Sequence, residues 1–360
     1  MSLMKKISDK WHQNVFNAFK KNETHLHDLT YLFWECTQRC NLNCLHCGSD
    51  CVADSNTKDM PFEDFLQAIL PLKKMFKPNT ITVAITGGEP LLREDLAHCG
   101  MTLRKNGFHW GIVTNGHDYT PQVHKNLIDA GLGSITLSFD GLKPSHNWLR
   151  SNDESFDRTA EALSLITSSR RLLYDVVTCV NKKNINELEQ LKEFFTAKNV
   201  AAWRLFTISP IGRAVHNDDL FLNREELKQL LDFIVRTRAE KRIKASVGCG
   251  DYVGGYERKI RDGYFFCRAG INIASVLIDG SISACPNINR NFAQGNIYSD
   301  SFSDVWNNRF AVMRNRKWTK TGICLTCKEY RNCNGGAMHL WNEKQDSIMT
   351  CVHQKLHENR

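Results

Sequence analysis

The chain has 360 residues, of which 42% are hydrophobic and 24% charged, with a net charge of +8. These values are typical of a soluble globular protein and argue against extended disorder. No stretch approaches the roughly 20 apolar residues that a membrane span needs, and no signal peptide is evident, so we expect a cytoplasmic protein without a membrane span. The modest positive charge does not indicate a nucleic-acid partner.

Segments with strand and helix character alternate from Thr30 to about Phe206. Strands are expected at 31–35, 80–86, 110–113, 134–139, 174–180 and 202–206, and helices at 62–76, 96–105, 121–130, 156–166 and 185–196. Pro71 should kink or split the first of these helices. Such alternation predicts a parallel sheet with helices outside, and about 180 residues suit a partial (β/α)6 barrel rather than a full one. Functional groups should therefore lie at the carboxyl ends of the strands.

The two ends of the chain differ from this pattern. Residues 1–28 are expected to form an N-terminal extension with a short amphipathic helix around Trp11–Phe19. Residues 29–245 then form the barrel, including a helix at 224–238. From 246 to 360 the chain is rich in Gly, Cys and Asn, and we expect metal to replace a hydrophobic core there.

Fourteen cysteines are the main clue to function. In a reducing cytosol they indicate metal sites rather than disulfides. Five of them lie between Cys36 and Cys51, directly after the first predicted strand. Within this group, Cys40, Cys44 and Cys47 have the spacing C-x3-C-x2-C. Three thiolates on one loop can hold three irons of a cubane and leave the fourth iron open for chemistry, by the logic that separates catalytic from structural zinc.

A zinc site is the alternative interpretation of this loop. Cys36, Cys51 or His46 could complete a set of zinc ligands, or the thiols could be unlinked and buried. Cys99 and Cys179 stand alone in the sequence and are expected to be core thiols.

The cysteine loop after the first strand of a partial barrel resembles the radical S-adenosylmethionine (SAM) superfamily. Polar or glycine-rich segments follow the later strands, as in that family: Gly87, Gly88, Glu89 and Pro90, then Asn115, then Ser138 and Asp140, then Asn181. The resemblance implies that these residues contact SAM. It also implies the chemistry: a reduced [4Fe–4S] cluster cleaves SAM to methionine and a 5′-deoxyadenosyl radical, which abstracts a hydrogen atom from the substrate.

A second set of cysteines resembles the SPASM extension of peptide-maturing relatives. Cys324, Cys327, Cys333 and Cys351 match the ligands of its outer auxiliary cluster, so the resemblance implies a fully ligated [4Fe–4S] cluster there. Cys267 and Cys285 match the inner cluster, but Ala337 stands where a further cysteine is expected. Cys249 is the candidate for the upstream ligand. One or two auxiliary clusters are therefore expected; the zinc ribbon is the alternative for the outer four cysteines.

The sequence predicts a radical SAM enzyme that modifies a peptide or small protein, with a flavodoxin or ferredoxin as its electron donor. Haem or porphyrinoid biosynthesis is the second hypothesis and a non-catalytic zinc-binding adaptor the third. Pro286 stands where sulfatase-maturing relatives have an aspartate, which counts against that reaction. Two basic clusters, at Arg236–Lys244 and Arg309–Lys320, are expected to be solvated helix faces or a docking surface for an acidic peptide or redox protein.

Overall fold

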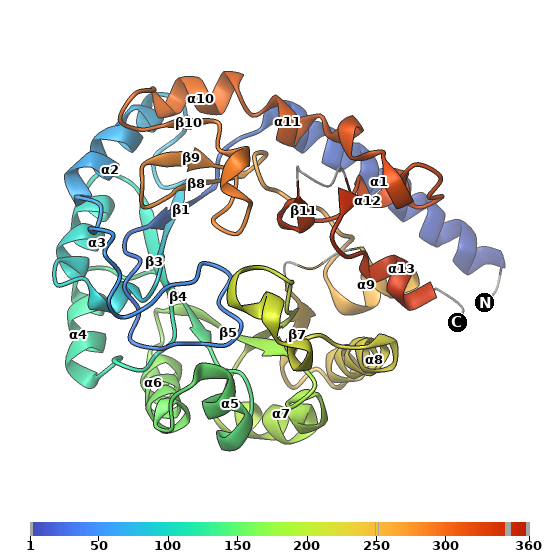
Figure 1. Cartoon of the computed structure of the whole chain (residues 1–360), viewed down its shortest axis with the longest axis horizontal. Coiled ribbons are helices and arrows are strands. Elements are labelled where there is room, and N and C mark those ends of the chain that lie inside the picture. Colours follow the sequence, from blue (N-terminus) through green and yellow to red (C-terminus); the bar gives the residue numbers. More distant parts are fainter. Residues whose placement is uncertain (1–2, 249, 251, 343–346, 358–360) are drawn as a thin grey trace.

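The computed structural model describes residues 3–248, 250, 252–342 and 347–357. One curved sheet of ten strands forms its centre, in the order β10-β9-β8-β1-β2-β3-β4-β5-β6-β7. Neighbouring strands from β8 through β1 to β7 are parallel, and β8, β9 and β10 pair antiparallel. Helices cover the outer face of the parallel part (Figure 1). This is the partial α/β barrel expected from the sequence, extended at both edges.

The strands and helices have the following bounds. The strands are β1 (Tyr31–Glu35), β2 (Thr82–Thr86), β3 (His109–Thr114), β4 (Ser134–Ser138), β5 (Leu173–Val180), β6 (Ala202–Thr207), β7 (Lys244–Val247), β8 (Ile273–Val276), β9 (Ser281–Ser283), β10 (Gly295–Asn296), β11 (Trp341–Asn342) and β12 (Ser347–Ile348). The α-helices are α1 (Leu3–Leu26), α2 (Phe62–Ile69), α3 (Leu96–Lys105), α4 (Pro121–Asp129), α5 (Lys143–Arg150), α6 (Ser155–Ser168), α7 (Leu188–Ala197), α8 (Arg224–Glu240), α9 (Glu257–Ile260), α10 (Phe302–Asn308), α11 (Ala311–Arg314), α12 (Tyr330–Cys333) and α13 (Val352–His357).

Local sequence explains several of these boundaries. The helix predicted over 62–76 ends at Ile69 and continues as a 3₁₀ helix over Leu70–Lys74, because Pro71 cannot donate a backbone hydrogen bond. Pro121 begins α4, and the Thr120 side chain accepts a hydrogen bond from the backbone of Val123. Asn223 and Glu226 form a capping box at the start of α8.

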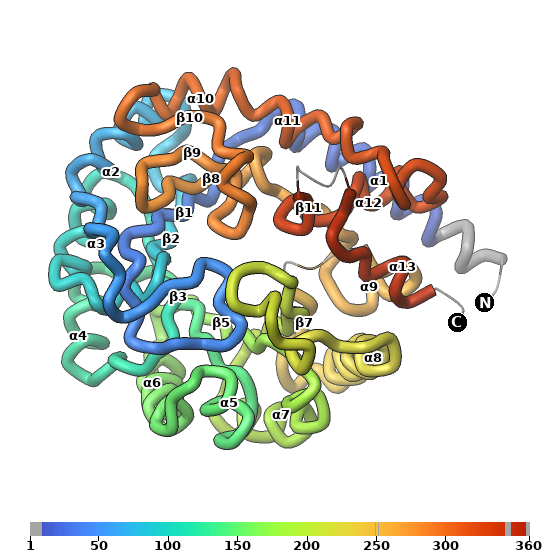
Figure 2. Tube along the Cα trace, in the orientation of Figure 1, coloured from blue at the N-terminus to red at the C-terminus, as the bar shows by residue number. Residues whose placement is uncertain are grey.

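The N-terminal helix is longer than predicted. Instead of a short helix around Trp11–Phe19, α1 spans 24 residues. It lies against the C-terminal part of the chain (Figure 2): the Lys20 ammonium donates to the Asn332 carbonyl, and Phe16 packs against Tyr264. This tertiary contact, which a local pattern does not reveal, extends the helix beyond its amphipathic stretch.

The C-terminal region also departs from expectation, since it has a well-developed apolar core. Buried side chains from this region include Phe302, Trp306, Phe310 and Trp341, each at most 2% exposed. They are continuous with the core of the barrel. The strand β8 pairs with β1, so this region completes one edge of the barrel sheet. Metal therefore supplements a core here and does not replace it.

Within the described residues, no helix combines the length and the apolar character needed to cross a bilayer.

Candidate active site

The loop that follows β1 carries Cys40, Cys44 and Cys47 at the carboxyl edge of the sheet (Figure 1). It is held by backbone hydrogen bonds from Cys40 to the Val52 carbonyl (3.1 Å) and from Leu45 to the Leu149 carbonyl (2.9 Å). Arg213, in a 3₁₀ helix over Gly212–His216, donates through its side chain to the carbonyls of Cys44 (2.9 Å) and Cys51 (3.0 Å). Protein contacts alone thus hold the loop from two sides.

The three thiols of this loop have different environments. Burial raises the pKa of the Cys40 thiol to about 12 and also raises that of Cys44. The pKa of Cys47 is lowered to about 5, because the Cys51 thiol donates a hydrogen bond to it. Cys51 is only 3% exposed. Thiols enclosed in this way fit a bound metal cluster, whose positive irons favour the thiolate form.

The Gly87–Pro90 segment packs against the backbone of the cysteine loop. The amide of Gly88 donates to the Thr37 carbonyl (2.7 Å) and that of Glu89 to the Arg39 carbonyl (2.8 Å). A Cβ atom on Gly88 would lie 2.0 Å from the Arg39 carbonyl oxygen, so a side chain is excluded there. These glycines are therefore required for contact between two loops, in addition to any role toward SAM. Pro90 is buried.

The side chains of Glu89 and Asn115 link the loops after β2 and β3. Glu89 is 1% exposed and accepts hydrogen bonds from the Thr114 hydroxyl (2.7 Å) and the Asn115 amide (2.8 Å). Burial raises the pKa of its carboxyl to about 7. The Asn115 side chain donates to Asn41 of the cysteine loop (2.8 Å). Both residues thus position the loop that carries the predicted cluster cysteines.

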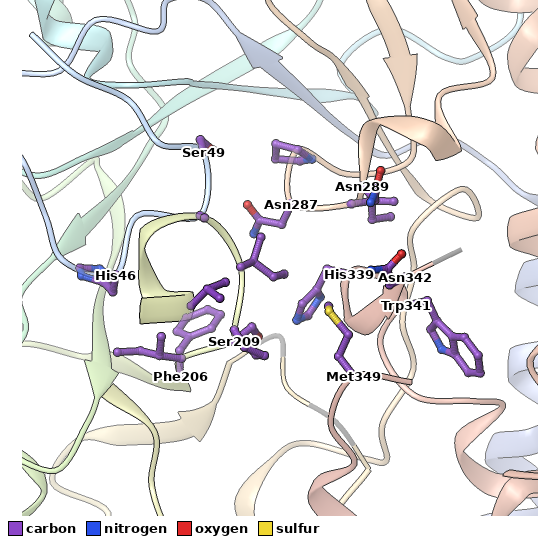
Figure 3. A pocket seen from close by; sticks show the side chains of 18 of the residues that line it. His46, Ser49, Phe206, Ser209, Asn287, Asn289, His339, Trp341, Asn342 and Met349 are labelled. Carbon is purple, nitrogen blue, oxygen red and sulfur yellow. The ribbon is translucent and has the colours of Figure 1, made fainter. Parts of the chain in front are cut away.

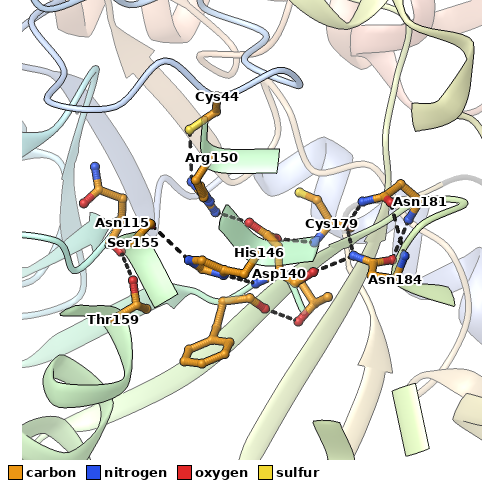
Figure 4. A network of polar contacts seen from close by, with 12 residues as sticks. Cys44, Asn115, Asp140, His146, Arg150, Ser155, Thr159, Cys179, Asn181 and Asn184 are labelled. Carbon is orange, nitrogen blue, oxygen red and sulfur yellow. Dashed lines mark hydrogen bonds and ion pairs between the residues drawn. The ribbon is translucent and has the colours of Figure 1, made fainter. Parts of the chain in front are cut away.

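Asp140 lies in a buried polar network (Figure 4). Its carboxylate is fully buried, forms an ion pair with Arg150 and accepts a hydrogen bond from the Cys179 amide (2.7 Å). Arg150 also donates to the sulfur of Cys44 (3.5 Å). Burial on its own would raise the pKa of Asp140, but Arg150, the nearby imidazoles and the Cys179 hydrogen bond together lower it. The Asp140 carboxylate faces Arg150, and its contact with SAM stays a prediction.

His146 and Asn181 complete the same network. The Asp140 amide donates to Nδ1 of His146 (3.0 Å), so this imidazole is neutral with its proton on Nε2, facing Ser155. Asn181 is 1% exposed, and its side-chain oxygen accepts from the amides of Lys183 and Asn184. Of the predicted SAM residues outside the glycine segment, Ser138 is the one that is half-buried; it ends β4.

A cavity of about 500 Å³ opens beside the cysteine loop (Figure 3). His46 and Ser49 of the loop line one side, Phe206 and the residues after β6 another, and the C-terminal region the rest. The C-terminal lining includes Asn287, Asn289, His339, Trp341, Asn342 and Met349. This wall could not be predicted from the sequence, because its residues come from segments that are distant in the chain and share no motif.

The four C-terminal cysteines line one cavity, and their role as cluster ligands stays a prediction. They are Cys324, Cys327, Cys333 and Cys351, and the cavity has a volume of about 220 Å³. The backbone of Gln354 donates to the sulfur of Cys351 (3.4 Å). No three His, Cys, Asp or Glu side chains within the described ranges meet the geometry of a single-ion site. A cavity walled by four thiols fits a cluster held by one cysteine per iron.

The predicted inner-cluster residues are distributed differently. Cys267 is 7% exposed and lines a separate groove with Cys333, while Cys285 follows β9. Ala337 is fully buried. Cys249 lies outside the described residues. The inner cluster stays a prediction.

Comparison with known proteins identifies the family. The profile of the Radical SAM superfamily matches residues 34–195, and that of the SPASM iron–sulfur cluster-binding domain matches residues 267–328. The chain is a radical SAM enzyme with a C-terminal SPASM domain. Both domains of this radical SAM enzyme imply [4Fe–4S] clusters.

Relatives of this radical SAM enzyme include haem synthases and mycofactocin maturases. The AdoMet-dependent heme synthase of Methanosarcina barkeri is 24% identical over 84% of this chain and 89% of its own length. The mycofactocin maturase MftC of Mycolicibacterium smegmatis is 27% identical over 85% of this chain and 77% of its own. These relatives are enzymes, which favours an enzyme over the zinc-binding adaptor.

Solved structures share the fold of this radical SAM enzyme. Streptococcus suis SuiB bound to S-adenosylmethionine superimposes with a TM-score of 0.70 at 17% identity, over 91% of this chain and 77% of SuiB. Native anSMEcpe with bound AdoMet gives a TM-score of 0.70 at 18% identity, over 91% and 94% of the two chains.

Proposed function

We propose that this radical SAM enzyme modifies a peptide or small protein in the cytoplasm. Cys40, Cys44 and Cys47 would hold the SAM-binding cluster, and Cys324, Cys327, Cys333 and Cys351 an auxiliary one. Bound at the first cluster, SAM supplies a 5′-deoxyadenosyl radical that abstracts hydrogen from a substrate carbon. The proposal includes the domain boundaries after residues 28 and 245, which separate the N-terminal extension, the barrel and the C-terminal domain. Position 245 lies within β7.

The charge of the cavity beside the cysteine loop carries this proposal. Arg290 is the one Lys or Arg among its described lining residues, and it is paired with Glu35 (3.2 Å) and Asp279 (3.3 Å). Burial lowers the pKa of His46 and of His339 to about 4, so both are neutral at pH 7. Haem precursors carry several carboxylates, which require cations when they leave water. This lining offers none that is unpaired.

The polar groups of the cavity suit a peptide instead. Asn287, Asn289 and Asn342 lie along its C-terminal wall (Figure 3). A carboxamide both donates and accepts hydrogen bonds, as a peptide group does. Phe206, Ile211 and Met349 supply apolar surface in the same cavity, so it can enclose a side chain while the amides bind the backbone that carries it. The similarity to the mycofactocin maturase and to SuiB, which has been solved bound to its precursor peptide SuiA, supports the same substrate class.

Mass spectrometry tests this function. Anaerobically reduced enzyme with SAM should change the mass of a small protein encoded beside its gene and release 5′-deoxyadenosine. Replacing Cys40, Cys44 and Cys47 by Ala should abolish both products, whereas Cys99→Ala, which alters a buried thiol of α3, should not. Turnover of a tetrapyrrole, with no mass change in any candidate peptide, would contradict the proposal and favour the haem pathway.

A further inference from the structure

A positively charged groove of about 610 Å³ lies between α1 and the C-terminal cysteine segment. Five cations line it. Lys20 and Lys21 come from α1, Arg314 ends α11, Arg316 follows it, and Arg331 belongs to α12. Lys21 and Arg331 are exposed to solvent. The groove shares no lining residue with the cavity beside the Cys40–Cys47 loop.

These cations differ from the other basic cluster of the chain. In and after α8, Arg236 pairs with Glu189 (3.2 Å), Arg238 with Asp262 (2.5 Å) and Arg242 with Glu193 (2.7 Å). In the part of the chain that the structure describes, none of the five groove cations forms an ion pair. Most cations of the α8 cluster are thus paired with carboxylates, while the groove keeps its positive field for an external partner.

The groove adjoins the cavity of the four C-terminal cysteines. Tyr330 and Cys333 line both spaces, so a single layer of side chains separates them. Lys20 is 5% exposed, and its ammonium donates to the carbonyl of Asn332 (2.6 Å), the neighbour of Cys333. Positive charge is therefore fixed within one residue of a predicted cluster ligand.

Apolar side chains are exposed at the same end of the molecule. Ile323 and Leu325, which flank Cys324, are 44% and 61% exposed. Ile323 also lines the cysteine cavity. Apolar surface next to a set of cations is a combination expected for a transient protein contact, in which the charges steer the encounter and the apolar groups lose water on docking.

We propose that this groove docks an acidic one-electron carrier, a flavodoxin or ferredoxin, which delivers electrons to the enzyme beside Cys333. The inference rests on the proposed function in one respect, that the four C-terminal cysteines hold a cluster. One electron leaves the reduced carrier and enters that cluster; no atom is transferred and no bond is formed. An acidic segment of a peptide substrate is the competing occupant. The carrier is favoured because the groove adjoins the C-terminal cysteines and lies apart from the substrate cavity.

Charge reversal of the two exposed groove cations tests the docking directly. The double variant Lys21→Glu/Arg331→Glu should bind reduced flavodoxin at least about tenfold more weakly than the wild type at low salt, and the difference should shrink as salt is added. A matched control, Lys73→Glu/Lys74→Glu, makes the same change in net charge after α2, at the other end of the molecule (Figure 1). It should bind like the wild type.

Two assays separate docking from catalysis. With dithionite as reductant, the groove variant should form 5′-deoxyadenosine at the wild-type rate, and with flavodoxin as reductant it should be slower. Equal affinity of both double variants for flavodoxin, or no binding by the wild type, would overturn the inference. Weaker binding of the peptide with unchanged binding of flavodoxin would assign the groove to the substrate and also overturn it. Failure of SAM cleavage with dithionite would count against the proposed function, while the binding comparison would still decide on the groove.

Discussion

Gly88 lies where the backbones of two loops meet, and its hydrogen side chain permits that contact. In Gly88→Ala, the new Cβ atom would lie 2.0 Å from the Arg39 carbonyl oxygen and 2.6 Å from its carbon. Because both are backbone atoms, the cysteine loop must move, at a cost of about 3 kcal/mol. We expect a lower melting temperature and incomplete iron incorporation after anaerobic reconstitution. Gly255→Ala is the control, since its Cβ meets no atom within 4 Å. Equal iron content in the two variants would contradict this account.

Glu89 makes stability depend on pH in an unusual direction. Burial raises the pKa of its carboxyl from 4.5 to about 7 in the folded protein. Between these values the folded chain keeps a proton that the unfolded chain has lost, so this group destabilises the fold as pH rises, by about 3 kcal/mol in total. Glu89→Gln removes the titration. From pH 4.5 to pH 7.5 the melting temperature of the wild type should therefore fall relative to that of the variant. Parallel curves would show that the carboxyl is ionised throughout.

At the scale of elements, sequence periodicity predicted those parts of the fold in which local and tertiary preferences agree. The six strands from β1 to β6 and α3 are examples. It missed α5, an eight-residue helix with the sequence KPSHNWLR, whose Pro, Ser, His and Asn residues are typical of a loop. Packing of buried Leu149 and Arg150 stabilises this helix, and such contacts between distant segments leave no local pattern. The pairing of β8 with β1 was missed for the same reason.

The missed helix has a functional consequence, because its last residue is Arg150. This buried guanidinium touches the Cys44 sulfur and pairs with Asp140. Hydrogen bonds to cluster sulfurs set reduction potentials, so Arg150→Met should lower the potential of the first cluster on the order of tens of millivolts. It should also destabilise the protein by about 3–5 kcal/mol, since Asp140 is left buried without a counterion.

A second variant separates these two effects. Arg150→Met/Asp140→Asn removes both charges, so it should recover much of the lost stability while keeping the lowered potential. Potentiometric titration followed by paramagnetic resonance, with thermal melts in parallel, measures both quantities. A double variant with the wild-type potential would show that Arg150 acts on the fold alone.

At the scale of the whole molecule, the two groups of cysteines could be predicted from the sequence, but the cavity and the groove beside them could not. The motif spacing predicted that Cys324, Cys327, Cys333 and Cys351 belong together, and the cavity that they line is consistent with this. The substrate cavity and the basic groove could not be predicted, because each is built from side chains that are distant in sequence. Their lining residues become neighbours when α1 and the C-terminal region pack on the barrel.

This arrangement leads to a prediction for the total iron content. Two complete cysteine sets, at Cys40–Cys47 and in the C-terminal cavity, would hold two [4Fe–4S] clusters, or about eight irons per chain. We predict that the inner auxiliary cluster adds none, because Ala337, at the position of its missing ligand, is fully buried in the apolar core. Replacing all four C-terminal cluster cysteines by Ala should halve the iron content, whereas Cys285→Ala should leave it unchanged. Iron and sulfide analysis of anaerobically reconstituted protein measures this. About twelve irons, with a loss of four in Cys285→Ala, would show that the inner cluster forms with a ligand other than cysteine at position 337.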